Sequence, residues 1–200
     1  MKENDHHFFA YISRMRFINR WALMRNSYTE NIQEHSHMTA VLAHALAVIR
    51  NQFFDGRVDE GQVAVAALYH DAGEILTGDM PTPVKYKNEA LRSAYKAVEQ
   101  ESARLMASLQ PEALRSETEE FLTGRVLNDA ERKILKAADR LSALIKCLEE
   151  CQSGNREFEA AREQQLAALH GMDCPEAEYF ITHLLPCYTQ NLDELTRGRF

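Results

Sequence analysis

The residues with the clearest potential for chemistry are a histidine and an aspartate that are adjacent in the sequence, His70 and Asp71. At the C-terminal turn of a helix, this pair would direct an imidazole nitrogen and a carboxylate toward one point. A mixed nitrogen and oxygen ligand set suits a divalent ion such as Mn, Fe, Co, Zn or Mg. A His-Asp dipeptide also arises by chance as a capped or salt-bridged pair, so alone it is weak evidence for a metal site.

Three further ionisable residues are predicted to lie on the inner faces of helices. His35 precedes Met38, the first residue of an apolar stripe, by three positions, and Asp139 lies at the edge of the stripe in AADRLSALIK. Glu74 follows His70 by one helical turn. An unpaired imidazole or carboxylate is costly to bury. A divalent cation held between the helices would explain these groups together; an ion-pair network without metal is the alternative.

The elements that would position these residues are predicted to be helices, because apolar residues recur at helical spacing and strand-like alternation is nearly absent. Asn31 followed by Glu34 resembles a capping box. Helices are expected over about 8–18, from Asn31, from about Asp59 to Gly73, over about 91–109, from Pro111, from Asn128 or Asp129 to Ser153, and from about Glu157 and Pro175. The segment TGDMPTP is expected to be a loop. The predicted fold is all-α, a single domain over residues 1–200 with a metal-site core at about 8–152 and C-terminal helices at about 155–195.

Composition narrows the class of partner. The 200 residues carry a formal net charge of -7, and a net negative protein is repelled by the phosphate backbone, so no nucleic acid polymer is expected as a partner. No apolar stretch reaches the length of a membrane span, and the segment MKENDHHFF does not resemble a signal peptide. None of the four cysteines forms a CxxC pair. These features predict a cytoplasmic protein with reduced thiols and no membrane partner.

The spacing of His35, His70-Asp71 and Asp139 resembles the H…HD…D signature of the HD-domain phosphohydrolases. The flanking segments RFINRWALMRN, TENIQEHS, ALYHDAGEILTGDMPTPVKY and KAADRLSALIKCLEE resemble the bacterial HD-domain 5'-deoxynucleotidases, from about Phe8 into the last helix. The signature alone identifies a superfamily, and NRW and TGDMPTPVKY narrow it. The resemblance implies an HD-domain helical bundle that removes phosphate from deoxyribonucleoside 5'-monophosphates. It also implies a homodimer.

The resemblance implies one divalent metal ion bound by His35, His70, Asp71 and Asp139. It favours Co or Mn, and Cu, Zn or Mg are the other candidates. Helix phase favours His35 over the nearby His37 as the ligand, although His37 departs from the family pattern and leaves the set ambiguous.

Further residues gain roles from the resemblance. Glu74 is implied as the catalytic acid or base, a choice that the sequence does not make. Arg20, with a planar guanidinium that matches phosphate oxygens, is implied as a catalytic and substrate-binding residue. The other implied substrate contacts are Trp21, His35, Asp71, Asp79, Met80, Pro81, Thr82 and Asp139. Lys85 could reach the phosphate, but an exposed position beside the loop is favoured.

Trp21 is adjacent to Arg20, and this adjacency suggests how ribose could be rejected. If the indole packs near the 2' carbon of the sugar, a 2'-hydroxyl would be buried without a partner. Such burial costs on the order of 1–3 kcal/mol. We therefore hypothesise that Trp21 discriminates deoxyribose from ribose.

The same ligand pattern is compatible with other functions. Within enzymes, the alternative is an HD-domain phosphodiesterase or nucleotide triphosphohydrolase, which would be expected to carry a second recognition motif or a larger, insert-rich chain. Outside enzymes, the alternative is a nucleotide- or metal-binding module that retains the ligands without turnover. The presence of Glu74 and Arg20 argues against a non-catalytic module.

Overall fold

The computed structural model describes residues 6–85 and 87–197, apart from the side chains of 82 and 83. Within these ranges the chain is helical, with no strand and one isolated bridge between Asn19 and Asn31. The elements are α1 (Phe8–Ile12), η1 (Ser13–Phe17), α2 (Ile32–Phe53), α3 (Glu60–Tyr69), α4 (Glu74–Thr77), α5 (Thr82–Lys85), α6 (Glu89–Ser108), α7 (Glu112–Leu122), α8 (Asp129–Gln152), η2 (Arg156–Phe158), α9 (Glu159–His170), α10 (Pro175–His183), η3 (Leu185–Thr189) and α11 (Leu192–Thr196). The predicted all-α fold is confirmed.

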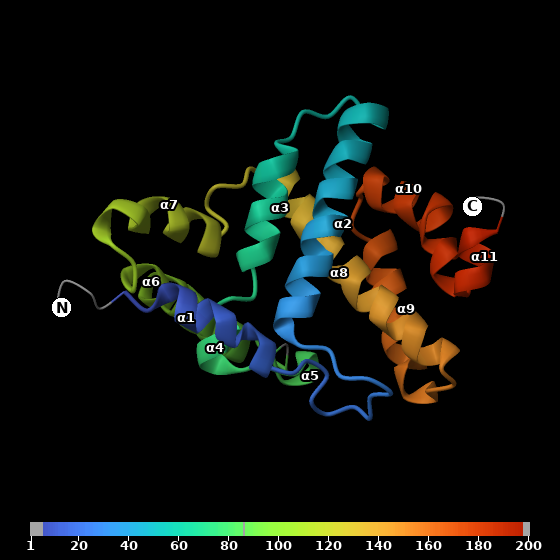
Figure 1. Cartoon of the computed structure of the whole chain (residues 1–200), viewed down its shortest axis with the longest axis horizontal. Helices are drawn as coiled ribbons and strands as arrows, with labels where there is room; N and C mark the ends of the chain where they lie inside the picture. The colour runs from blue at the N-terminus through green and yellow to red at the C-terminus, as the bar shows by residue number, and fades with distance from the viewer. Residues whose placement is uncertain (1–5, 86, 198–200) are drawn as a thin grey trace.

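Three helices, α2, α3 and α8, form the centre of the molecule, and α2 packs against both of the others (Figure 1). Their shared core is built from small and branched apolar side chains, among them Leu46, Val63 and Leu141, all fully buried. Small residues such as Ala43 and Ala67 let the helix axes approach closely. The two long helices therefore form a rigid base that holds side chains of α2 and α8 in fixed positions.

Side-chain caps fix where these long helices begin. The Asn31 side chain accepts hydrogen bonds from the backbone N–H groups of Gln33 and Glu34, and the Asn31 backbone N–H donates to the Glu34 carboxylate. Asn128 and Glu131 form the same reciprocal arrangement at the start of α8. Each cap satisfies backbone donors that the first helical turn leaves open. The predicted start at Asn31 is confirmed, and Asn128 rather than Asp129 caps α8.

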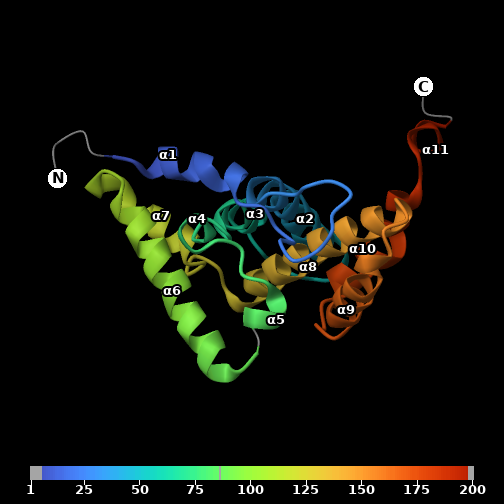
Figure 2. The ribbon, with the colours of Figure 1, turned by 90° about the horizontal axis from the view of Figure 1, so that it is seen from below.

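The remaining helices flank the centre on two sides. Figure 2 shows α1, α6 and α7 on one side and α9, α10 and α11 on the other. A second buried cluster, which includes Phe8, Ile32 and Met106, joins the first group to the start of α2. Of the described helices, none is long and apolar enough to cross a membrane.

Several sequence expectations were wrong in detail. The helix predicted from Asp59 to Gly73 ends at Tyr69, and Glu74 begins a separate short helix, α4. The reason is that the backbone tightens into three-residue turns here, with Ala72 bonded to Tyr69 and Glu74 bonded to Asp71. Gly73 lies in this turn and faces α6, where an added Cβ would come within 3.5 Å of Ser102 Cβ.

Other differences concern which helical faces are buried. Val41, Val98 and Leu105 recur at helical spacing with apolar neighbours, a pattern that predicts inward-facing side chains, yet each is about half exposed. In α6 the buried face is instead formed by Tyr95, Ser102, Ala103, Met106 and Ala107, because only one side of this helix meets the rest of the molecule. The segment predicted as a loop, residues 77–83, includes the first two residues of α5, and α11 was not predicted.

Candidate metal centre and substrate site

Three of the predicted ligands converge where α2 meets the end of α3. One ligand atom from each of His35, His70 and Asp71 lies within 4.8 Å of the others. The Asp71 carboxylate is 3.5 Å from His35 Nε2 and 3.2 Å from His70 Nε2. Two imidazole nitrogens and a carboxylate oxygen directed at one point are a donor set typical of a divalent metal site. These three side chains could hold a metal ion, and together with the adjacent Asp139 they are called the metal group below.

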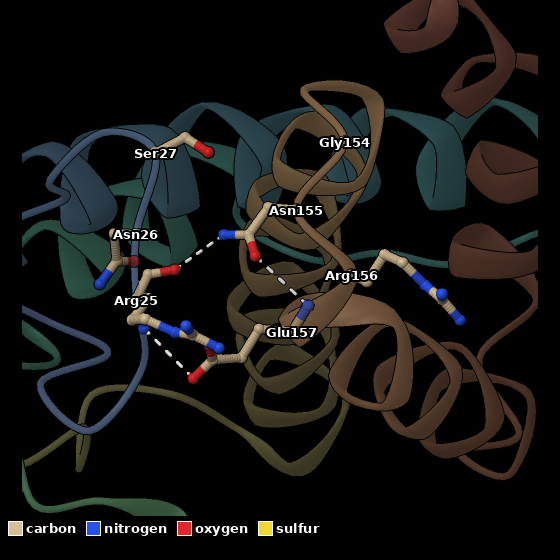
Figure 3. Close-up of a pocket in the computed structure, with 7 residues that line it drawn as sticks. All are labelled: Arg25, Asn26, Ser27, Gly154, Asn155, Arg156 and Glu157. Carbon is tan, nitrogen blue, oxygen red and sulfur yellow. Dashed lines mark hydrogen bonds and ion pairs between the residues drawn. The ribbon is translucent and has the colours of Figure 1, made fainter.

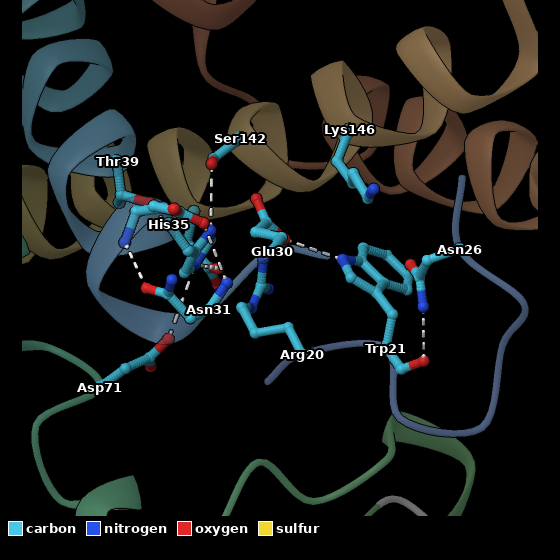
Figure 4. A network of polar contacts seen from close by, with 12 residues as sticks. Arg20, Trp21, Asn26, Glu30, Asn31, His35, Thr39, Asp71, Ser142 and Lys146 are labelled. Carbon is cyan, nitrogen blue, oxygen red and sulfur yellow. Dashed lines mark hydrogen bonds and ion pairs between the residues drawn. The ribbon is translucent and has the colours of Figure 1, made fainter. Parts of the chain in front are cut away.

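Hydrogen bonds behind the rings direct the Nε2 atoms into this group. His70 Nδ1 lies 2.7 Å from the Ala67 carbonyl oxygen, which can only accept, so Nδ1 carries the proton. His35 Nδ1 lies 3.0 Å from the Ser142 hydroxyl, which can either donate to it or accept from it (Figure 4). His70 Nε2 is buried and has no hydrogen-bond partner. A buried lone pair without a partner, on a ring fixed from behind, fits a metal ligand.

Asp139 joins the group from α8. Its carboxylate lies 3.2 Å from His35 Nε2 and 3.3 Å from Lys136 Nζ. Burial would raise the pKa of Asp139, but the His35 hydrogen bond and the Lys136 charge outweigh it, so this pKa lies well below its ordinary value. Asp139 is therefore ionised at neutral pH, as a metal ligand must be. Its distance to His35 places it beside the three-residue group.

Arg20 and Trp21 lie next to this group on the segment before α2. The Arg20 side chain is 13% exposed, and its Nη1 is 2.7 Å from Glu30 Oε2. Burial would lower the pKa of Arg20, but Glu30, Asp71, Asp139 and Asp79 together raise it. The guanidinium is thus a positive charge close to the acids of the metal group.

Trp21 has an unusual backbone for a large residue. Its φ angle is 60°, in the left-handed region that side chains with a Cβ disfavour. The indole Nε1 donates to Glu30 Oε2 at 2.9 Å, and the ring packs against Phe158 with 5.4 Å between centroids. Asn26 Nδ2 donates to the Trp21 carbonyl at 3.3 Å (Figure 4). Contacts on several sides therefore hold a strained residue at the rim of the site.

Glu74 is 8% exposed and begins α4. Burial, followed by the nearby negative charges of Asp71 and Asp79, raises the pKa of Glu74 to about 10 in the protein without metal. Its Oε2 is buried without a hydrogen-bond partner. A carboxyl in this environment holds a proton at neutral pH, and a nearby divalent ion would lower this pKa. Such a group is a candidate for proton transfer.

The loop after α4 supplies Asp79, Met80 and Pro81, all half-buried. Burial raises the pKa of Asp79, and Asp71 adds to this, while Arg20 and a hydrogen bond from the Trp21 backbone oppose it. Asp79 therefore lies near Arg20 and Trp21. Thr82 is the first residue of α5, but its side chain falls outside the part of the chain that the structure describes.

Two residues with undecided roles are now placed. Lys85 is not a freely exposed lysine: its Nζ is 2.6 Å from Glu99 and lies over the Tyr95 ring. Lys85 thus lies against α6, and its positive charge is close enough to Glu74 to lower the pKa of that carboxyl. His37 is exposed and lines a surface hollow of about 450 Å³ beside Asn31, so the structure brings His35, and not His37, to the metal group.

A second surface hollow, of about 400 Å³, lies between the tip of the 21–30 segment and the residues after α8 (Figure 3). Asn155 donates to the Arg25 carbonyl, and Glu157 accepts from the Arg25 side chain across it. None of the predicted site residues lines this hollow. It marks where the 21–30 segment is fastened to the rest of the molecule.

Sequence reasoning missed the residues that hold the site from behind. Ser142, which orients His35, is a common residue on a helix and gives no signal by type. Glu30 binds both Arg20 and Trp21, and its place in the polar connection before the Asn31 cap gave no signal of this role. Buried Lys146 and Glu150 pair with each other beneath the same segment. Their spacing of i, i+4 on α8 was the only available signal.

Comparison with known proteins identifies the family of this chain. Residues 7–188 match the model of the family described as 5'-deoxynucleotidase YfbR-like. The chain is 44% identical over 191 residues to the 5'-deoxynucleotidase YfbR of Escherichia coli (strain K12 / DH10B), which covers 96% of each chain. It is 43% identical over 194 residues to the 5'-deoxynucleotidase ECA3034 of Pectobacterium atrosepticum, which covers 97% of this chain and 98% of that one.

Solved structures share the fold. An HD-domain phosphohydrolase from Listeria innocua superposes with a TM-score of 0.81 at 24% identity, over 96% of this chain and 92% of that one. The cyanophage S-2L HD phosphohydrolase DatZ, bound to dA and one catalytic Zn²⁺ ion, superposes with a TM-score of 0.67 at 18% identity, over 91% and 96%. The helical bundle is thus an HD-domain fold. With the family model matched over most of its length, the chain belongs to the YfbR-like 5'-deoxynucleotidase family.

Proposed function

We propose that this protein is a metal-dependent 5'-deoxynucleotidase, which hydrolyses deoxyribonucleoside 5'-monophosphates to the deoxyribonucleoside and phosphate. The observation that carries the proposal is the placement of Arg20 and Trp21 beside the group formed by His35, His70 and Asp71. A cation for phosphate and a flat apolar ring for the sugar lie next to a metal-type donor set. The curated relatives that match nearly the whole chain are named for this activity.

His35, His70, Asp71 and Asp139 are the residues that would hold one divalent ion. The unpartnered Nε2 of His70 and the ionised Asp139 fit this role. When bound, such an ion lowers the pKa of a water molecule and polarises a phosphate oxygen. The His/Asp set accepts several ions; the resemblance favours Co or Mn, and the structural relative DatZ carries Zn²⁺.

The chain's own residues supply orientation and proton transfer. Arg20 presents the guanidinium nitrogens that Glu30 does not occupy, and these can bind two phosphate oxygens. Hydrolysis forms a P–O bond to water and breaks the bond to the 5'-oxygen, which must gain a proton. Glu74, a buried carboxyl with a raised pKa, is the group proposed to move that proton.

The sugar is proposed to lie between Trp21 and Asp79. Asp79 can accept a hydrogen bond from the 3'-hydroxyl, and the half-buried Pro81 stiffens the loop that carries it. The Trp21 ring, fixed by Glu30 and Phe158, would face the 2' carbon. A 2'-hydroxyl there would lose its water without gaining a partner.

The test is phosphate release from a panel of ribo- and deoxyribonucleoside 5'-monophosphates, triphosphates and a phosphodiester. Chelator-stripped protein is assayed with Co, Mn, Mg, Zn and Cu added back one at a time. We expect release only with metal, only from monophosphates, and faster from the deoxy forms. Pyrophosphate from triphosphates or turnover of the diester would overturn the proposal.

We also propose a homodimer located in the cytoplasm. All four cysteines are free, which suits a reducing compartment. Large apolar side chains after α9, including Leu184, Leu192 and Leu195, are exposed and could be covered by a second copy. Light scattering coupled to size-exclusion chromatography measures the mass directly, and a mass near 22.9 kDa would contradict the dimer.

A further inference from the structure

The Glu30 carboxylate accepts hydrogen bonds from both residues proposed to read the substrate. A single oxygen, Oε2, lies 2.7 Å from Arg20 Nη1 and 2.9 Å from Trp21 Nε1 (Figure 4). Its side chain is 12% exposed, similar to the 13% of Arg20. A carboxylate that accepts from a guanidinium makes a strong, charge-assisted bond, and burial limits competition from water. The two donors are thus tied to one point.

The backbone around Glu30 makes this point rigid. Arg20 N donates to the Glu30 carbonyl at 2.9 Å, and Ile32 N donates to the Ile18 carbonyl at 3.0 Å. The segments 18–20 and 30–32 therefore run side by side and close the 21–29 loop at its neck. Because Asn31 caps α2, Glu30 sits at the fixed end of a long helix.

The loop is also fastened at its tip. The buried Glu150 carboxylate accepts from the Ser27 backbone at 2.9 Å, and the buried Lys146 ammonium donates to the Tyr28 carbonyl at 2.7 Å. Lys146 and Glu150 also pair with each other. Since Tyr28 precedes Glu30 by two positions, these contacts from α8 hold the loop backbone immediately before Glu30.

Trp21 needs such a restraint. Its backbone has a left-handed, strained conformation. Among the described residues, Glu30 is the acceptor for the hydrogen bond that its indole Nε1–H donates. Without Glu30 the ring could rotate away from Phe158, and Arg20 would lose its nearest counter-charge and its fixed orientation.

We propose that Glu30 is a positioning residue that holds Arg20 and Trp21 in one arrangement, so that phosphate orientation and sugar discrimination depend on the same carboxylate. Glu30 leaves the outer guanidinium nitrogens of Arg20 available to the phosphate. This proposal rests on the proposed function for its kinetic part. Its structural part, the immobilised indole, is independent of any substrate.

The experiment uses the fact that Trp21 is the only tryptophan in the chain. Acrylamide quenching and fluorescence anisotropy therefore report on this ring alone. Wild type, Glu30→Ala and Glu30→Gln are compared, with Glu157→Gln as the matched control, because Glu157 also holds this loop, through Arg25, but touches neither Arg20 nor Trp21. Glu30→Gln keeps an acceptor oxygen and loses the charge.

For Glu30→Ala we expect faster quenching, lower anisotropy, a KM for deoxyribonucleoside monophosphates raised about tenfold, and a deoxy-to-ribo ratio of kcat/KM lowered about tenfold. Glu30→Gln should lie between Glu30→Ala and wild type, and Glu157→Gln should match wild type.

Unchanged quenching and an unchanged deoxy-to-ribo ratio in Glu30→Ala would overturn the proposal, as would equal changes in Glu157→Gln. If Glu30→Ala does not fold, Glu30→Gln decides by the same readouts. A wild type that turns over no nucleotide would refute the proposed function, while quenching would still decide whether Glu30 restrains Trp21.

Discussion

His35 Nε2 lies 3.2 Å from Asp139 Oδ1, and this contact joins α2 to α8 at the centre of the candidate site. The two residues are far apart in the sequence, and each is carried by a long helix with its own capping box. Small buried residues between the helices hold the contact in place. The metal group is therefore built on rigid elements, which is what precise ligand geometry requires.

Replacing His70 should remove the metal without unfolding the protein. His70 Nε2 is buried and unpartnered, so in His70→Ala a ligand is lost while few other contacts change. We expect metal content, measured by mass spectrometry after mild chelation, to fall by about tenfold or more. His37→Ala is the matched control, because His37 is an exposed histidine on the adjacent α2. Equal metal loss in both variants would contradict the ligand assignment.

Replacing Glu74 should slow the chemistry while the metal stays bound. A positioned acid or base typically contributes about 10²–10⁴-fold to the rate, so we expect Glu74→Gln to lower kcat by that factor with KM little changed. The measurement is phosphate release together with metal content. If the kcat of Glu74→Gln stays within about twofold of wild type, a proton-transfer role for Glu74 is wrong.

The all-α fold, and the inward helical faces that carry two of the candidate ligands, could be predicted from the sequence because both depend on local pattern. Helical spacing and the Asn31 and Asn128 caps predicted α2 and α8, and their phases placed His35 and Asp139 inward. Glu74 was assigned to the site by continuing a helix that in fact stops at Tyr69. It reaches the site because the turn at Gly73 redirects the chain, and helical periodicity does not encode that turn.

The supporting residues could not be predicted, since their roles arise from contacts between distant segments. Glu30 acts on Arg20 and Trp21 across a closed loop, and Ser142 acts on His35 across a helix interface. Neither relationship follows from spacing along one element. Buried charges such as Lys146 resemble ordinary helix-surface residues in a sequence, and only the fold shows which segment covers them.

The aromatic ring of Trp21 should control sugar preference. Trp21→Ala removes the surface proposed to face the 2' carbon, so we expect the deoxy-to-ribo ratio of kcat/KM to fall by about tenfold to a hundredfold. Trp21→Phe keeps an apolar ring but loses the Nε1–H that Glu30 accepts, and an intermediate ratio is expected. Kinetics on paired deoxyribo- and ribonucleoside monophosphates provide the measurement. A ratio unchanged in Trp21→Ala would show that another group rejects the 2'-hydroxyl.

The Glu150 carboxylate should make stability depend on pH in the acid range. Burial would raise its pKa, but hydrogen bonds from Lys146, Ser27 and Asn155 outweigh it and lower the pKa of Glu150 to about 2. A group with a folded pKa below its unfolded value of 4.5 stabilises the protein above that value, and the contribution is lost as pH falls from about 4.5 to about 2.

Glu150→Gln should therefore be destabilised at pH 7, by about 3 kcal/mol, because buried Lys146 loses its partner. The difference from wild type should shrink as pH falls toward 3, because the unfolded wild type takes up a proton below pH 4.5 that the folded state, with its pKa of about 2, does not. Urea unfolding at several pH values measures both free energies. The control is Glu149→Gln, which changes the neighbouring, half-buried carboxylate. This carboxylate accepts a hydrogen bond from the Tyr28 hydroxyl, and the Glu149 backbone carbonyl accepts one from the Ser153 hydroxyl. A destabilisation of Glu150→Gln that stayed constant from pH 7 to pH 3 would mean that Glu150 stabilises the loop by packing, and that its charge contributes nothing.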